Sequence, residues 1–165
     1  MVSPDAMNKR ALIKKIVAKL TSELEVYFRA AQSSRAEASH EQNKAENKYD
    51  TRGLEASYLA IGQAKQAQEL ENAIVEFGKL DGRKFAAGEG IGMGAIVELE
   101  MGAEKSLYFI GPRAGGTEVV HDKREVLIIT PQSPLGAQLL EKKSGDHPLL
   151  ELGGRRQAAR IISVE

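Results

Sequence analysis

Four carboxylates lie in or beside a polar stretch of the chain, residues 40–53, and they are the side chains best suited to metal chemistry. Carboxylate oxygens are preferred ligands of Mg²⁺, which usually takes one or two of them and completes its shell with water. Glu46 and Asp50 are therefore candidate Mg²⁺ ligands, and Glu55 and Glu41 are further candidates beside them. The alternative is that these acids cap a helix or stay solvated, as acids near a helix start commonly do.

Two amphipathic stretches must position these carboxylates. Apolar residues recur at steps of three and four over residues 13–31 and again over 54–80, which places one narrow stripe on each predicted helix. Such a stripe is typical of a coiled-coil seam. We therefore predict an extension over residues 1–7 and an antiparallel α-helical coiled-coil hairpin over 8–81, with its tip near 40–53. The predicted seam comprises Ile13, Ile16, Val17, Leu20, Leu24, Tyr27 and Ala31, facing Leu54, Tyr58, Ile61, Ala64, Ala67, Leu70, Ile74, Phe77 and Leu80.

The predicted hairpin is long, and one end of it is basic. Arms of about 30 residues rise about 45 Å, so we expect function to lie at the tip. Five basic residues cluster at the start of the first arm: Lys9, Arg10, Lys14, Lys15 and Lys19. This basic cluster is either a solvated helix face or a patch that meets RNA or an acidic protein surface.

Residues 82–165 follow a different pattern. Residues 82–94 are rich in Gly and Ala and are predicted to link the hairpin to a second domain at 95–165, where the hydrophobic period changes to two. Ser133 is a predicted N-cap, with Pro134 at the first position of a short helix. Strands are predicted at 95–100, 106–110, 126–130, 149–152 and 157–164, a loop at 111–117 and the helix at 134–143. The fold class is therefore two-domain α+β, with a small antiparallel sheet and one short helix in the second domain.

The composition excludes several classes of function. The chain has 165 residues with 23 basic and 23 acidic side chains, so bulk charge does not favour nucleic-acid binding. Without Cys it has no thiolate metal site and no cysteine nucleophile. With 5% aromatic residues and no Trp, neither a base-stacking platform nor an aromatic-lined isomerase pocket is expected. No apolar run approaches ~18 residues and no signal-peptide pattern opens the sequence, which predicts a cytoplasmic protein without a membrane span.

Five short motifs in the second half carry a family resemblance. In chain order they are Ile-Gly-Pro at 110–112, Ser-Pro-Leu-Gly at 133–136, Leu-Leu-Glu-Lys-Lys at 139–143, Gly-Asp at 145–146 and Gly-Gly at 153–154. Together with the preceding helical hairpin, their order and spacing resemble the bacterial Gre transcript-cleavage factors, GreA and GreB. The resemblance covers nearly the whole chain.

The resemblance implies both a fold and a partner. It implies an FKBP-like domain that docks on RNA polymerase near the secondary channel, and a coiled coil that enters this channel. The candidate polymerase-binding residues are Gly111, Pro112, Arg113, Ser133 and Pro134. The implied protein is a monomeric transcription regulator that is no enzyme itself and binds no cofactor alone. Its Mg²⁺ would come from the polymerase, and it would contact nascent RNA and DNA only indirectly, in the elongation complex.

The resemblance also gives the acidic tip a role. Gre factors carry an Asp and a Glu three residues apart, then an Asn and shortly a Tyr. In one register Glu46 and Asn47 occupy the Glu-Asn positions, with Tyr49 after them and Asn43 where the family has its Asp. In a second register Glu55 belongs to the segment that leads to the Tyr at position 58, and Asp50 approximates the first acid. Both registers leave extra residues around the tip.

Four functions follow from these observations. The leading hypothesis is stimulation of cleavage of backtracked transcripts by carboxylates presented to the polymerase Mg²⁺ site. The second is a Gre paralogue that occupies the channel and inhibits or retunes transcription without cleavage, which Asn43 and the extra tip residues favour. The third is an FKBP-like prolyl isomerase with a helical handle, and the fourth is a coiled-coil adaptor.

Overall fold

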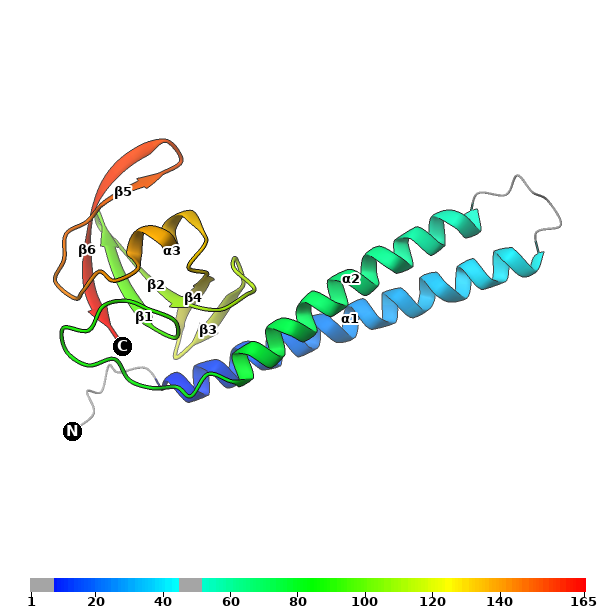
Figure 1. The fold of residues 1–165 in the computed structure, drawn as a ribbon, viewed down its shortest axis with the longest axis horizontal. Coiled ribbons are helices and arrows are strands. Elements are labelled where there is room, and N and C mark those ends of the chain that lie inside the picture. The colour runs from blue at the N-terminus through cyan, green and yellow to red at the C-terminus, as the bar shows by residue number, and fades with distance from the viewer. Residues whose placement is uncertain (1–7, 45–51) are drawn as a thin grey trace. The chain divides into compact units, whose positions relative to one another are not determined.

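The computed structural model describes residues 8–44 and 52–165, and for 31–44 and 52–60 it describes the backbone alone. The chain begins with two helices, α1 (Lys9–Lys44) and α2 (Arg52–Gly78). Six strands and a short helix, α3, follow in the order β1-β2-β3-β4-α3-β5-β6 (Figure 1). Two compact units result: Met1–Val17 with Glu76–Glu165, which we call the sheet unit, and Ala18–Val75, the hairpin unit. An N-terminal helical region with a C-terminal sheet confirms the two-domain α+β class.

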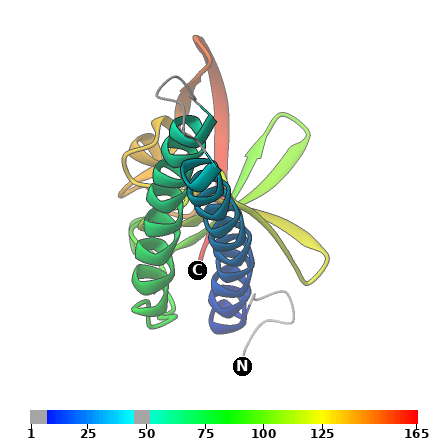
Figure 2. The same ribbon diagram turned by 90° about the vertical axis from the view of Figure 1, so that its right-hand side faces the viewer.

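In the hairpin unit, α1 and α2 run side by side in opposite directions, as both views show (Figures 1 and 2). Leu20 and Ala67, two residues of the predicted seam, are buried there. Ile61 is 55% exposed, so its predicted place in the seam is wrong. The predicted stripe advances by steps of three from position 58 to 70, and each such step turns about 60° backwards around a helix of 3.6 residues per turn. Ile61 consequently lies about 120° around α2 from Ala67.

The first turns of α1 and the last turn of α2 belong to the core of the sheet unit. Leu12, Ile16 and Phe77 are fully buried. The ring of Phe77 packs on that of Phe109 in β2, with centroids 6.1 Å apart. Complete burial of such side chains stabilises a fold by about 1.5–3 kcal/mol each. The helix ends therefore contribute a substantial part of this core.

The sheet is mixed, with the strand order β3-β4-β2-β1-β6-β5. The strands are β1 (Ile96–Met101), β2 (Glu104–Ile110), β3 (Glu118–His121), β4 (Arg124–Ile129), β5 (Leu149–Leu152) and β6 (Arg155–Val164). Neighbouring strands pair antiparallel except β2 and β4, which pair parallel over Leu107–Ile110 and Val126–Ile129. The prediction of a wholly antiparallel sheet is therefore wrong for the pairing of β2 with β4. The prediction of five strands also omits one of the six strands that the structure contains.

The missing strand is β3, which forms a tight hairpin with β4. The chain leaves β2, passes along β3 at the edge of the sheet and returns as β4, so β4 runs in the direction of β2. Asp122 and Lys123 make the turn with φ angles of 51° and 64°. Left-handed values at both central residues are those of a type I′ turn, for which Asn-Gly is the usual sequence signal. Asp-Lys gives no such signal, and β3 itself has only 4 residues.

Helix α3 (Pro134–Leu139) lies against the apolar cluster on one face of the sheet. Leu139 joins Val97, Leu99, Ile110 and Ile161 in this cluster. The predicted helix extends to residue 143, but α3 stops earlier because the chain turns sharply after it, with Glu141 at a φ of 67°. None of the described helices combines the length and the apolar character needed to cross a membrane.

Residues 82–94, predicted as a linker, pack on the sheet unit. Ile91 is buried in the cluster beneath α3, its N–H donates to the Lys142 carbonyl at 2.8 Å, and its carbonyl accepts from Glu141 N–H at 2.8 Å. The backbone of Gly90 passes so close to Glu141 that a Cβ on Gly90 would lie 2.9 Å from the Glu141 carbonyl oxygen. The glycines here thus permit close backbone approach.

Candidate functional site

The acidic candidates fall at the connection between α1 and α2. Glu46 and Asp50 lie outside the described residues. Glu41 and Asn43 belong to the end of α1 and Glu55 to the start of α2, where the backbone alone is described. The proposed Mg²⁺ site at the tip therefore stays a prediction. Among the side chains that the structure describes, no three His, Asp or Glu residues are grouped to hold a metal ion.

Three of the polymerase-binding candidates, Gly111, Pro112 and Arg113, lie in the loop at 111–117. Gly111 is buried, and a Cβ at this position would lie 2.7 Å from Cζ of Phe77 and 2.9 Å from Cγ2 of Ile128. A glycine is therefore required where the loop passes the base of α2. Arg113 extends toward α2, where its Nε donates to Oε2 of Glu76 at 2.6 Å. Both side chains of this ion pair are about 40% exposed, so it orients Arg113 at a wet surface.

Ser133 and Pro134 start α3. Ser133 Oγ accepts from the N–H of Gly136 at 3.1 Å and donates to the Thr130 carbonyl at 2.7 Å, which confirms the predicted N-cap. A Cβ on Gly136 would lie 1.9 Å from the Thr130 carbonyl oxygen, so the fourth residue of the motif must be glycine. This motif accordingly fixes the corner before α3, and Pro134 is its exposed member.

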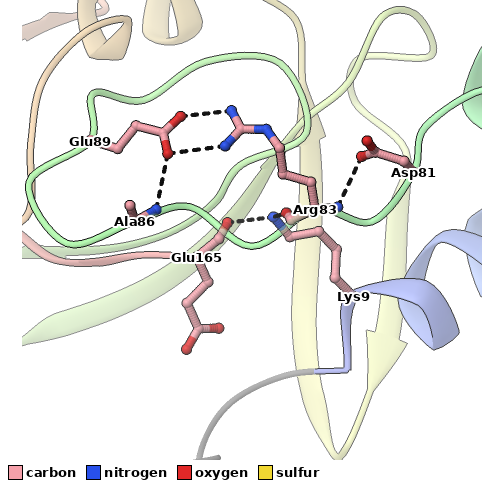
Figure 3. Close-up of polar contacts among 6 residues, drawn as sticks. All are labelled: Lys9, Asp81, Arg83, Ala86, Glu89 and Glu165. Atoms are coloured by element: carbon pink, nitrogen blue, oxygen red, sulfur yellow. Dashed lines mark hydrogen bonds and ion pairs between the residues drawn. The ribbon is translucent and has the colours of Figure 1, made fainter.

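Lys9 differs from the other residues of the basic cluster because it is only 6% exposed. Its Nζ donates to the backbone carbonyl oxygens of Arg83 at 2.6 Å and Glu165 at 2.7 Å (Figure 3). Burial, together with the nearby positive charge of Arg83, lowers the pKa of Lys9 from its ordinary 10.5 to about 8. Lys9 thus ties α1 to the segment after α2 and to the end of β6. Arg10, Lys14, Lys15 and Lys19 are exposed.

Arg83 and Glu89 form a bidentate ion pair beside Lys9 (Figure 3). The two guanidinium nitrogens donate to the carboxylate oxygens at 3.0 and 2.6 Å, and the N–H of Ala86 donates to the same carboxylate at 2.9 Å. The hydrogen bond from Arg83, supported by that from Ala86, lowers the pKa of Glu89 to about 2. The Phe85 ring lies under both cations, 4.7 Å from Lys9 Nζ and 4.2 Å from Arg83 Cζ.

Comparisons with known proteins give likenesses only among solved structures. No protein-family model matches the chain, and no curated protein matches it. The crystal structure of GreA factor homolog 1 (Gfh1) of Thermus thermophilus is 22% identical, covering 90% of this chain and 94% of that one, with a TM-score of 0.38. A structure described as the transcription factor Gfh1 is 21% identical, covering 92% and 94%, with a TM-score of 0.39. Gfh1 of Thermus aquaticus is 23% identical, covering 90% and 92%, also with a TM-score of 0.39.

The structural neighbours of this chain are Gre-factor homologues.

The sequence did not predict the cluster around Lys9. Arg83, Phe85 and Glu89 fall in a Gly-rich stretch with no regular period, so nothing in their spacing indicates that they meet. The closest signal is Lys9 itself, which is basic but lies four residues before Ile13, where the apolar stripe would continue toward the start of the helix. A lysine at the end of a buried stripe often extends its stem over apolar surface, and in the structure Lys9 Nζ lies 4.7 Å from the centre of the Phe85 ring.

Proposed function

We propose that this chain is a transcription elongation factor that binds RNA polymerase through the secondary channel and has no active site of its own. The observation that carries this proposal is the pair of long helices. α1 has 36 residues and α2 has 27, and the residues between them include Glu46 and Asp50. At about 1.5 Å per residue, α1 rises about 54 Å. Helices of this length can carry the residues that join them deep into a partner's channel.

The motifs of the sheet unit support the proposal because they have definite structural tasks. Gly111 makes room for Phe77, and Ser133 and Gly136 build the corner before α3. Gly153 and Gly154 turn the chain between β5 and β6 at φ angles of 58° and 79°. Because each of these residues meets a steric, capping or turn requirement, the motifs are not a chance run of common residues. The resemblance to Gre factors therefore extends to the parts that determine the fold.

The proposed action is stimulation of transcript cleavage by the polymerase. Two-metal hydrolysis of a phosphodiester uses one ion to activate water and another to stabilise the leaving oxygen. Glu46 and Asp50 would offer carboxylate oxygens to an Mg²⁺ that the polymerase supplies, and Glu55 and Glu41 lie near enough in sequence to assist. The chain itself contributes charge and position, while the polymerase contributes the hydrolytic centre.

A second action is favoured by one specific observation. Asn43 stands where the family carries its first acid in one of the two registers. An amide oxygen can ligate Mg²⁺ but brings no negative charge, so it attracts a weakly held ion less well. A factor with this tip would occupy the channel and slow or retune transcription without promoting cleavage.

Cleavage of RNA in backtracked elongation complexes distinguishes the two actions. Wild type would be compared with Glu46→Ala and Asp50→Ala, and with Glu104→Ala as a control, since Glu104 is an exposed acid in β2. We expect wild type to accelerate cleavage and the two tip variants to lose about tenfold or more, as loss of a metal-site group commonly does. Glu104→Ala should keep the wild-type rate.

Binding is measured separately, by retention of the chain on immobilised polymerase. Retention together with an unchanged cleavage rate would remove the cleavage role and leave the second action, which the tip substitutions should then spare. If the wild-type chain is not retained on polymerase, both proposed actions are refuted. The coiled-coil adaptor and prolyl isomerase hypotheses would then be the ones to test.

A further inference from the structure

A shallow groove follows the first two turns of α1 within the sheet unit. It is lined by Arg10, Ile13, Lys14, Val17, Gly78, Leu80 and Asp81, and its volume is about 480 Å³. The four residues from α1 stand at positions i, i+3, i+4 and i+7, so the groove runs along the helix axis for about 10 Å. Its other wall is the end of α2 and the residues that follow.

The floor of this groove is apolar and its width depends on a glycine. Ile13, Val17 and Leu80 supply the apolar surface. Gly78 borders the groove, and a Cβ built on it would meet no atom within 4 Å. Its φ lies outside the left-handed region, so a larger residue fits there without backbone strain. The space beside Gly78 is therefore open because this residue has no side chain.

The rim of the groove is positively charged. Arg10 and Lys14 stand one helical turn apart at its edge, and within the described side chains, residues 8–30 and 61–165, neither forms an ion pair. The single acid of the rim, Asp81, accepts a hydrogen bond from the N–H of Arg83 at 3.0 Å. The two cations thus leave a net positive edge beside an apolar floor.

From this groove we infer that the sheet unit has a docking site for an acidic amphipathic helix of a partner protein. An elongated apolar groove along one face of a helix fits a second helix that inserts residues spaced i, i+3, i+4 and i+7. Carboxylates on the flank of that helix complement Arg10 and Lys14, which sets its orientation and speeds its association. The site belongs to the sheet unit, whereas the acidic candidates belong to the connection between α1 and α2, so the inference does not depend on the proposed function.

Two designed peptides test the assignment. The acidic probe is a fluorescein-labelled helix of about 18 residues, or five turns, with Leu on one stripe and Glu on the flanks. The basic probe is identical except that each Glu is Lys. Fluorescence anisotropy with the full chain should give binding of the acidic probe at least about tenfold tighter than the basic probe, equivalent to about 1.4 kcal/mol. This preference should shrink as salt concentration rises.

Three variants locate the site. Gly78→Trp fills the groove, Arg10→Glu with Lys14→Glu reverses its rim, and Lys15→Glu is the matched control because Lys15 is an exposed neighbour that does not line it. The first two should weaken the acidic probe at least about tenfold, and the third should leave its affinity within about twofold. Circular dichroism melts confirm folding, and if Gly78→Trp fails to fold, the double charge reversal still decides.

Several outcomes would overturn the assignment. One is equal affinity for the two probes, and another is an affinity for the acidic probe that none of the groove variants changes. A third is concentration-dependent dimerisation of the chain that Gly78→Trp abolishes, because a second copy would then be the occupant. Absence of any binding of the acidic probe at millimolar concentration would also reject it.

Discussion

At the scale of single residues, the buried ammonium of Lys9 makes two hydrogen bonds and a cation–π contact. It donates to the carbonyls of Arg83 and Glu165, two residues far from it and from each other in sequence, and it lies over the ring of Phe85. A buried ammonium costs free energy that its hydrogen bonds only partly return. Its pKa of about 8, lowered chiefly by burial, records that balance.

The lowered pKa of Lys9 makes stability depend on pH in a defined window. In the unfolded chain the ammonium loses its proton near its ordinary pKa of 10.5, and in the folded chain near 8. Between these values the unfolded state binds more protons, so stability rises with pH from about 8 to about 10.5. Below pH 8 both states are protonated, and above 10.5 neither is.

We expect Lys9→Met to abolish this rise and to destabilise the fold at pH 7. Methionine keeps an apolar side chain of similar length but leaves the carbonyls of Arg83 and Glu165 without their donor, which costs about 1–3 kcal/mol. Urea unfolding at intervals from pH 7 to pH 10.5 measures both effects, with Lys15→Met as the control because Lys15 is exposed. Parallel pH profiles for wild type and Lys9→Met would contradict the assignment.

At the scale of elements, period and capping residues predict most of this fold, and long-range pairing does not follow from them. The two long helices, the start of α3 with its Ser133 cap, the hairpin across Gly102 and strand β5 agree with the sequence patterns because each depends on neighbours within a few residues. The parallel pairing of β2 with β4 depends on a strand of four residues and an Asp-Lys turn, neither of which has a strong local signal.

The candidate site shows the same division. The sequence predicted the basic residues that are exposed at the start of α1, but not the burial of Lys9 among Arg83, Phe85 and Glu89. Contacts between segments more than 70 residues apart leave no trace in hydrophobic periodicity. The acids at 46 and 50 follow from residue type together with the resemblance to Gre factors, and their chemistry stays a prediction.

Two glycine substitutions test the helices as elements. Gly62 is exposed in α2 with open space around its Cβ position, so Gly62→Ala should stabilise the chain by about 0.5–1 kcal/mol through helix propensity. Gly136→Ala in α3 should destabilise it by about 1–3 kcal/mol or more, because the new Cβ would collide with the Thr130 carbonyl. Urea unfolding of both variants beside wild type measures the difference. Equal effects of the two substitutions would show that the environment of α3 is misjudged.

At the scale of the whole molecule, the sheet unit is discontinuous in sequence. It combines Met1–Val17 with Glu76–Glu165, so the start of α1 and the end of α2 belong to the same compact body as the six strands. Leu12, Ile16 and Phe77 contribute fully buried side chains to it. A boundary drawn at the Gly-rich stretch would separate these residues from the core that they complete.

This organisation predicts the behaviour of two shortened chains. Residues 82–165 alone lack Leu12, Ile16 and Phe77, each of which stabilises the fold by about 1.5–3 kcal/mol through burial. They also lack the Lys9 ammonium that donates to the carbonyls of Arg83 and Glu165. We expect this fragment to unfold at a much lower temperature than the full chain and to bind a hydrophobic dye on the face that carries Phe109.

A matched chain that joins residues 8–17 to 76–165 through a flexible Gly/Ser linker keeps the whole sheet unit. It should therefore retain most of the stability and should not bind the dye. Thermal unfolding followed by circular dichroism compares the two directly. If residues 82–165 melted at the same temperature as the linked chain, the helix ends would be dispensable to this core, and the burial of Phe77 against Phe109 would not have the energetic weight assigned to it.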